Sequence, residues 1–139
     1  MNELMNKHLV FVYGTLRRGG VRSMPDLFPA SKFIDNANVG GSLYDLGDFP
    51  GLLLDESNSS VIGEVYEIDD EILNQLDEIE ASTYYWRKQI EIEVGNSRKA
   101  CWVYEFDAKF YSPSVLIASG DWIDYARTKT VSPEDKRPD

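Results

Sequence analysis

The chain has 139 residues, with 24 acidic and 14 basic side chains and a formal net charge of -10. A chain of this length is expected to form one domain, and its 42% hydrophobic residues supply a core, which excludes wholesale disorder. The acidic excess opposes contact with a phosphate backbone, so nucleic acid is not an expected partner. No apolar run reaches the roughly 18 to 20 residues that a membrane span needs, so no membrane association is expected either.

Residues 1–130 are predicted to form the single domain. The last segment, VSPEDKRPD at residues 131–139, combines charge with two prolines and has no apolar residue after Val131. A segment of this composition cannot bury itself, so we expect it to be a disordered tail.

The chain has one cysteine, Cys101, and one histidine, His8. A lone cysteine cannot form an internal disulfide, and two such ligands are too few for a structural zinc site, so no metal is expected. Cys101 lies in an apolar run and is predicted to be a core residue. The cysteine content and a start that carries charge in place of an apolar signal segment predict a cytoplasmic location.

Short apolar segments separated by turn residues predict six or seven strands. The first, residues 8–13, is continuously apolar, which is typical of a strand buried on both faces. The later segments lie at residues 33–39, 42–46, 52–54, 61–68, 89–94 and 99–106. Gly95 and Asn96 separate the last two segments and predict a hairpin. Many short strands with few helices favour a curved mixed sheet or a small barrel.

The clearest helix is predicted for residues 69–80, with Asp69 as its N-cap. Its apolar side chains recur at helical spacing; they are Ile72, Leu73, Leu76 and Ile79. The aromatic residues 84–86 follow this helix and either pack over the sheet or wall a pocket. A weaker helix is predicted for about residues 119–126.

Glu80 is the one acid near the end of the first helix that is directed at its apolar face. At about 100° per residue it lies about 40° from Leu76, whereas Glu78 points the opposite way and Asp77 lies just outside the apolar arc. Desolvation and the negative end of the helix dipole both raise the pKa of such a carboxyl, which suits a group that accepts and returns a proton near neutral pH. The alternative is that the helix frays and Glu80 turns into water.

The first strand breaks into a loop at Gly14, within the segment YGTLR at residues 13–17. Backbone N–H groups at such a turn form a concavity for an anion or a developing oxyanion, and glycine lets a ligand approach the backbone. The alternative is a strand that simply ends in glycine. Arg17, Arg18 and Arg22 beside the turn either attract a carboxylate or lie in a solvated loop.

Four segments in order match a known pattern. They are VFVYGTLR at residues 10–17, GSLYDLGDFPGL at residues 41–52, GEVYEI at residues 63–68, and LDEIE at residues 76–80, the last followed by Tyr85 and Arg87. Together they resemble the γ-glutamylcyclotransferase-like family, in which the last segment carries the catalytic glutamate. Residues 119–122 resemble the close of its small bacterial members.

The resemblance implies a mixed α/β (α+β) fold in which a small mixed β-barrel is flanked by a few helices. It implies a cavity between a substrate-binding loop, formed by Tyr13, Gly14, Thr15 and Leu16, and a catalytic Glu80. The implied reaction releases 5-oxoproline and a free amine or amino acid from a small γ-glutamyl compound. Glu80 would act as base and then as acid, and no metal or organic cofactor is required.

Three alternatives stand beside this hypothesis. The same pocket could remove a γ-glutamyl protecting group from a metabolite in a biosynthetic pathway. A non-catalytic module of the same fold could bind a small carboxylate or amine, with Glu80 only as a contact. An acidic protein-interaction domain would leave an inward-facing Glu80 unexplained. The resemblance leaves open the leaving group, the pathway and the oligomeric state.

Overall fold

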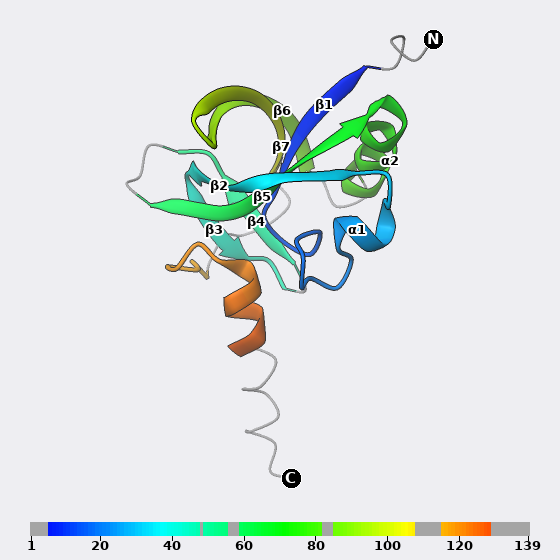
Figure 1. Ribbon diagram of the computed structural model, residues 1–139. Coiled ribbons are helices and arrows are strands. Elements are labelled where there is room, and N and C mark those ends of the chain that lie inside the picture. Colours follow the sequence, from blue (N-terminus) through cyan, green and yellow to red (C-terminus); the bar gives the residue numbers. More distant parts are fainter. Residues whose placement is uncertain (1–5, 48, 56–58, 82–84, 108–114, 129–139) are drawn as a thin grey trace.

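The computed structural model describes residues 6–47, 49–55, 59–81, 85–107 and 115–128 (Figure 1). The elements are, in order, β1 (Lys7–Val12), α1 (Met24–Leu27), β2 (Lys32–Gly40), β3 (Ser42–Asp45), β4 (Pro50–Leu53), β5 (Ser60–Asp69), α2 (Asp70–Ala81), β6 (Tyr85–Val94), β7 (Ser97–Phe106) and a helix over residues 122–128. The predicted strands and both predicted helices are present, with ends shifted by a few residues. The predicted tail, residues 131–139, lies outside the described residues.

Five strands form one curled, mixed sheet in the order β2-β5-β1-β7-β6. All neighbouring pairs are antiparallel except β1 and β7, which run parallel. The hairpin of β6 and β7 turns at Gly95 and Asn96, as predicted, and curls over one side of the molecule (Figure 1). β3 and β4 form a separate two-stranded sheet. The expected mixed α/β fold with a curved, mixed sheet is therefore confirmed.

The central strand β1 is buried on both faces, as its continuous apolar sequence predicted. Successive side chains of a strand point to opposite faces. Phe11 joins one core cluster, which also holds Cys101, whereas Val10 and Val12 join a second cluster with the apolar face of α2. Cys101 is fully buried, which confirms its prediction as a core residue.

Helix α2 begins where the sequence predicts. The Oδ1 atom of Asp69 accepts a hydrogen bond of 2.9 Å from the backbone N–H of Ile72, which is the contact expected of an N-cap. Leu73 and Leu76 are buried against the sheet, and the helix continues to Ala81. The helix therefore does not fray before Glu80.

α1 is the element that the sequence analysis did not predict. It has four residues, begins with Pro25 in its first turn, and buries Met24. A single turn is too short to show helical periodicity, so the sequence pattern predicts no helix at this position.

A buried ion pair ties the loop after β1 to the rest of the molecule. Nε of Arg17 lies 3.3 Å from Oε2 of Glu64 on β5, and its Nη1 lies 3.0 Å from Oδ1 of Asp121, just before the last helix. Glu64 also accepts hydrogen bonds from the Arg18 backbone N–H at 3.0 Å and from the Tyr66 hydroxyl at 2.9 Å. With only 12% of its side chain exposed, Arg17 is not part of a solvated loop.

None of the helices in the described part of the chain has both the length and the apolar composition that crossing a bilayer requires. Over the same residues, His, Cys, Asp and Glu side chains nowhere gather in the threes that could hold a metal ion.

Replacing Glu64 tests how much the buried ion pair contributes. We expect Glu64→Ala to lower the free energy of unfolding by about 3 to 5 kcal/mol, because it leaves the buried Arg17 with Asp121 as its one carboxylate partner among the described residues. The change also removes the acceptor of the hydrogen bonds from the Arg18 backbone N–H and the Tyr66 hydroxyl. Urea unfolding at pH 7 measures the change.

The control is Glu67→Ala. Glu67 lies half-buried on the same strand and takes part in no ion pair between described residues. We expect this variant to change stability by less than about 1 kcal/mol. Equal losses in the two variants would contradict a structural role for the pair.

Candidate active site

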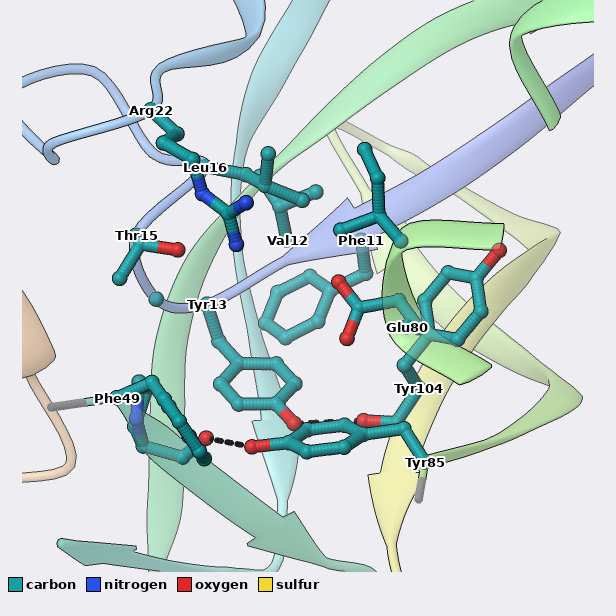
Figure 2. Close-up of a pocket in the computed structure, with 13 residues that line it drawn as sticks. Phe11, Val12, Tyr13, Thr15, Leu16, Arg22, Phe49, Glu80, Tyr85 and Tyr104 are labelled. Carbon is teal, nitrogen blue, oxygen red and sulfur yellow. Dashed lines mark hydrogen bonds between the residues drawn. The ribbon is translucent and has the colours of Figure 1, made fainter. Parts of the chain in front are cut away.

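A cavity of about 60 Å³ opens between the loop after β1 and the last turn of α2. All five residues assigned to the site from the sequence line it; they are Tyr13, Gly14, Thr15, Leu16 and Glu80. Figure 2 shows the Glu80 carboxylate directed into this space from α2. A cavity of this size has room for a small organic group or a few water molecules.

Glu80 is the acidic residue among the described residues that line the cavity, and its surroundings change its pKa. Burial raises the pKa of its carboxyl to about 7, while the positive charge of Arg22 acts in the opposite direction. Near neutral pH such a group is protonated about half the time, so it accepts and donates protons with equal ease. Glu78, two residues earlier, is exposed, as the helical wheel predicted.

Tyr13 forms a rigid part of the cavity wall. Its hydroxyl donates a hydrogen bond of 2.6 Å to the Tyr104 carbonyl and accepts one of 3.2 Å from the Leu52 backbone N–H. Burial, with the nearby Tyr85 and Glu80, raises the pKa of this phenol well above its usual range. Tyr13 therefore stays neutral, and its hydroxyl is committed to the backbone.

Two further tyrosines complete the aromatic wall. The Tyr85 hydroxyl donates to the Pro50 carbonyl, and the Tyr104 hydroxyl donates to Oδ1 of Asp77 at 2.7 Å. Nη1 of Arg87 lies 3.1 Å from the other oxygen of Asp77, close enough for an ion pair but not aligned as a hydrogen bond. Because Asp77 is one helical turn before Glu80, these contacts hold the end of α2 in place.

In the loop after β1, the backbone carbonyls accept hydrogen bonds from within the loop. Arg17 donates its backbone N–H to the Gly14 carbonyl at 3.0 Å, and Arg22 donates to the Thr15 carbonyl at 2.9 Å. Among hydrogen bonds between described residues, none is donated by the backbone N–H of Gly14, Thr15 or Leu16. These backbone N–H groups lie at the cavity wall, where they could donate hydrogen bonds to an anionic group of a ligand.

Gly14 has a packing reason as well. A Cβ atom at this position would lie 2.5 Å from Cγ of Pro50, so any larger residue would displace the wall that Pro50 forms. The sequence predicts a glycine here for the approach of a ligand, whereas the contact with Pro50 joins distant residues and has no signal in the sequence.

Comparison with known proteins adds an independent observation. The sequence model of the family described as "Gamma-glutamyl cyclotransferase, AIG2-like" matches residues 10–124. The chain belongs to this family. A Vibrio cholerae protein, provisionally named a gamma-glutamylcyclotransferase, is 40% identical over 119 residues, which cover 84% of this chain and 96% of that protein. A Niallia circulans protein named gamma-L-glutamyl-butirosin B gamma-glutamyl cyclotransferase is 32% identical over 136 residues, covering 92% of this chain and 83% of that protein.

Solved structures of the AIG2-like fold are also similar. An AIG2-like protein from Mus musculus matches with a TM-score of 0.72 and 25% identity, covering 84% of this chain and 88% of that chain. YkqA from Bacillus subtilis matches with a TM-score of 0.74 and 26% identity over 91% of this chain, which spans only 43% of YkqA. The family and the fold that the sequence resemblance implies are therefore confirmed. The family and these relatives carry the names of gamma-glutamylcyclotransferase-type enzymes.

Several residues that line this cyclotransferase-family cavity were not assigned to the site from the sequence. They are Phe11, Val12, Arg22, Phe49, Pro50, Ile79, Tyr85 and Tyr104. Tyr85, predicted either to pack over the sheet or to wall a pocket, lines the pocket. Arg22, predicted either to attract a carboxylate or to lie in a solvated loop, is exposed and also lines the cavity.

The raised pKa of Glu80 predicts a stability difference that depends on pH. The carboxyl titrates near 4.5 when unfolded and at about 7 when folded. Between these values the folded state binds more protons, so ionising Glu80 costs stability as pH rises. We expect Glu80→Gln, which cannot ionise, to gain stability relative to the native protein between pH 5 and pH 8, by up to about 3 kcal/mol.

Thermal or urea unfolding at both pH values measures this gain. Glu78→Gln removes an exposed acid from the same helix and should show no such pH-dependent gain. A stability difference for Glu80→Gln that is the same at pH 5 and pH 8 would show that the carboxyl titrates normally.

Proposed function

We propose that this protein releases 5-oxoproline from a small γ-glutamyl compound, with Glu80 as general base and then general acid. Tyr13, Gly14, Thr15 and Leu16 form the substrate-binding wall. The observation that carries the proposal is the Glu80 carboxyl, which faces a small cavity with a pKa of about 7 across from the amides of that loop.

The chemistry needs one group that moves a proton twice. The α-amine of a γ-glutamyl group is protonated at neutral pH, so it must lose a proton before its nitrogen attacks the γ-carbonyl carbon of the same molecule. Glu80 accepts that proton and releases it to water. It then accepts a second proton from the attacking nitrogen as the new C–N bond forms, and gives this one to the leaving nitrogen as the old C–N bond breaks. The products are 5-oxoproline and a free amine, which takes up a proton from water. A carboxyl with a pKa near 7 serves both steps.

Both reacting groups belong to one substrate, which reduces the protein's task to positioning. When the γ-glutamyl group of the substrate is held in a ring-like conformation, its amine lies against its γ-carbonyl. This alignment removes much of the activation barrier to ring closure. The apolar and aromatic wall, with Phe11 and Tyr104 among its residues, leaves room for a compact group of this kind.

The amides of Gly14, Thr15 and Leu16 supply the remaining contact. Either they bind the α-carboxylate of the substrate, or they donate to the carbonyl oxygen as it becomes negatively charged. Fixed backbone donors aimed at developing charge are an effective form of catalysis because they need no reorganisation.

One relative suggests a substrate class. The Niallia circulans protein is named for action on gamma-L-glutamyl-butirosin B and is 32% identical to this chain. We therefore include γ-glutamylated metabolites beside γ-glutamyl amines and dipeptides, and removal of a γ-glutamyl group within a biosynthetic pathway is the second candidate function.

A panel of γ-glutamyl compounds tests the proposal. We expect the native protein to form 5-oxoproline from at least one member, and Glu80→Gln to lower kcat by about 10²- to 10⁴-fold, because the proton transfers lose their carrier. Glu78→Gln, on the exposed side of the same helix, should keep native activity.

Circular dichroism must first show that each variant is folded. Equal activity of the native protein and Glu80→Gln would mean that Glu80 is the wrong residue. Binding of panel members without any 5-oxoproline would replace the enzyme hypothesis with that of a non-catalytic small-molecule binding module.

The dependence of kcat/KM on pH provides a further test. Among the described residues, the charged and titratable groups that line the cavity with Glu80 are Arg22, Tyr13, Tyr85 and Tyr104. The pKa values of Tyr13 and Tyr104 are raised. Glu80 is the carboxyl among these groups, and its pKa of about 7 predicts that kcat/KM rises through an acid limb at about pH 7. An acid limb below pH 5 would rule out Glu80 as the base in this form.

A further inference from the structure

Arg22 brings a positive charge to the cavity from the side opposite Glu80. Figure 2 shows its guanidinium extending into the space that the Glu80 carboxylate also enters. Among the described residues that line the cavity, Arg22 is the one with a cationic side chain.

The other two arginines of this loop are engaged elsewhere. Arg17 pairs with Glu64 and Asp121, and the Arg18 guanidinium lies 4.1 Å from the centre of the Phe33 ring. Arg22, by contrast, takes part in no ion pair with any residue that the structure describes. Its charge is directed at the cavity.

We propose that Arg22 binds the α-carboxylate of the γ-glutamyl group and so determines which way the substrate enters; this inference rests on the proposed function. The α-carbon of that group carries one ammonium and one carboxylate. With the ammonium at Glu80, where its proton is removed, the carboxylate faces the Arg22 guanidinium. The reverse placement sets like charges against each other at both ends, so the head group has one favoured orientation.

The backbone supports this arrangement. The Arg22 backbone N–H donates to the Thr15 carbonyl at 2.9 Å, and the Met24 N–H donates to the Leu16 carbonyl at 2.8 Å. Arg22 is therefore fixed to the same loop whose amides line the cavity. If the guanidinium binds the α-carboxylate, the backbone amides of residues 14–16 remain available to the oxygen of the γ-carbonyl. The two anionic groups of the reacting substrate then have different partners.

The contact between Arg22 and the α-carboxylate can be isolated by a double cycle, in which the substrate and the protein are changed separately and together. The substrates are the most active γ-glutamyl amine of the panel and its analogue in which the α-carboxylate is an α-carboxamide. The analogue yields 5-oxoprolinamide, so the released amine is measured for both. Amidation also changes the basicity of the α-amine, but this effect is common to all variants and cancels when they are compared.

For the native protein we expect amidation to lower kcat/KM by about 10- to 100-fold, the range of a charged hydrogen-bonded pair. Arg22→Gln should lose a similar factor with the natural substrate and no longer distinguish the two compounds. The loss should lie in KM, because the α-carboxylate is bound equally in the ground state and the transition state. Arg22→Lys should retain part of the discrimination, since it keeps the charge but not the planar fork.

Arg18→Gln is the matched control, because it removes the same charge from the same loop but not from the cavity. It should discriminate as the native protein does. An active Arg22→Gln that still prefers the carboxylate by the native factor would overturn the inference and leave the proposed function standing.

If the native protein binds these compounds without turning them over, the proposed function fails. The same cycle of dissociation constants, measured by calorimetry, then tests the Arg22 contact alone. Absence of both turnover and binding would overturn both proposals.

Discussion

The packing of helix α2 on the central strands is the interaction on which the site depends. Ile72, Leu73 and Leu76 are buried in the cluster that includes Val10 and Val12 of β1. Burying three such side chains contributes about 5 to 9 kcal/mol. The ionisation of a carboxyl whose pKa is raised from 4.5 to about 7 costs up to about 3 kcal/mol. The apolar face therefore holds Glu80 in its partly desolvated position despite that cost.

The same packing places the two sides of the cavity. β1 runs under the helix and continues directly into the loop that begins at Tyr13, so the position of α2 on β1 determines how Glu80 faces that loop. Asp77 adds a polar constraint, because its contacts with Tyr104 and Arg87 fix the helix one turn before Glu80. The proton transfers that we propose for Glu80 need this kind of rigid support, because they occur over a short path.

Much of this could be predicted from the sequence because it depends on local patterns. Alternation predicted the strands, an N-cap and an apolar stripe predicted α2, and the helical wheel placed Glu80 inward and Glu78 outward. Contacts between distant residues have no such pattern. Tyr13 bonds to the Tyr104 carbonyl 91 residues away, and Arg17 reaches Asp121 across 104 residues. The different roles of the three arginines follow from these contacts, so the sequence could present them only as a basic cluster.

We attribute the proton affinity of Glu80 to its surroundings in the fold and not to the intrinsic chemistry of a glutamate. The side-chain carboxyl carbon of Glu80 can be followed by ¹³C NMR during a pH titration, with the resonance assigned by its loss in Glu80→Gln. We expect a single transition at about pH 7. A transition near pH 4.5, the ordinary value for glutamate, would contradict it.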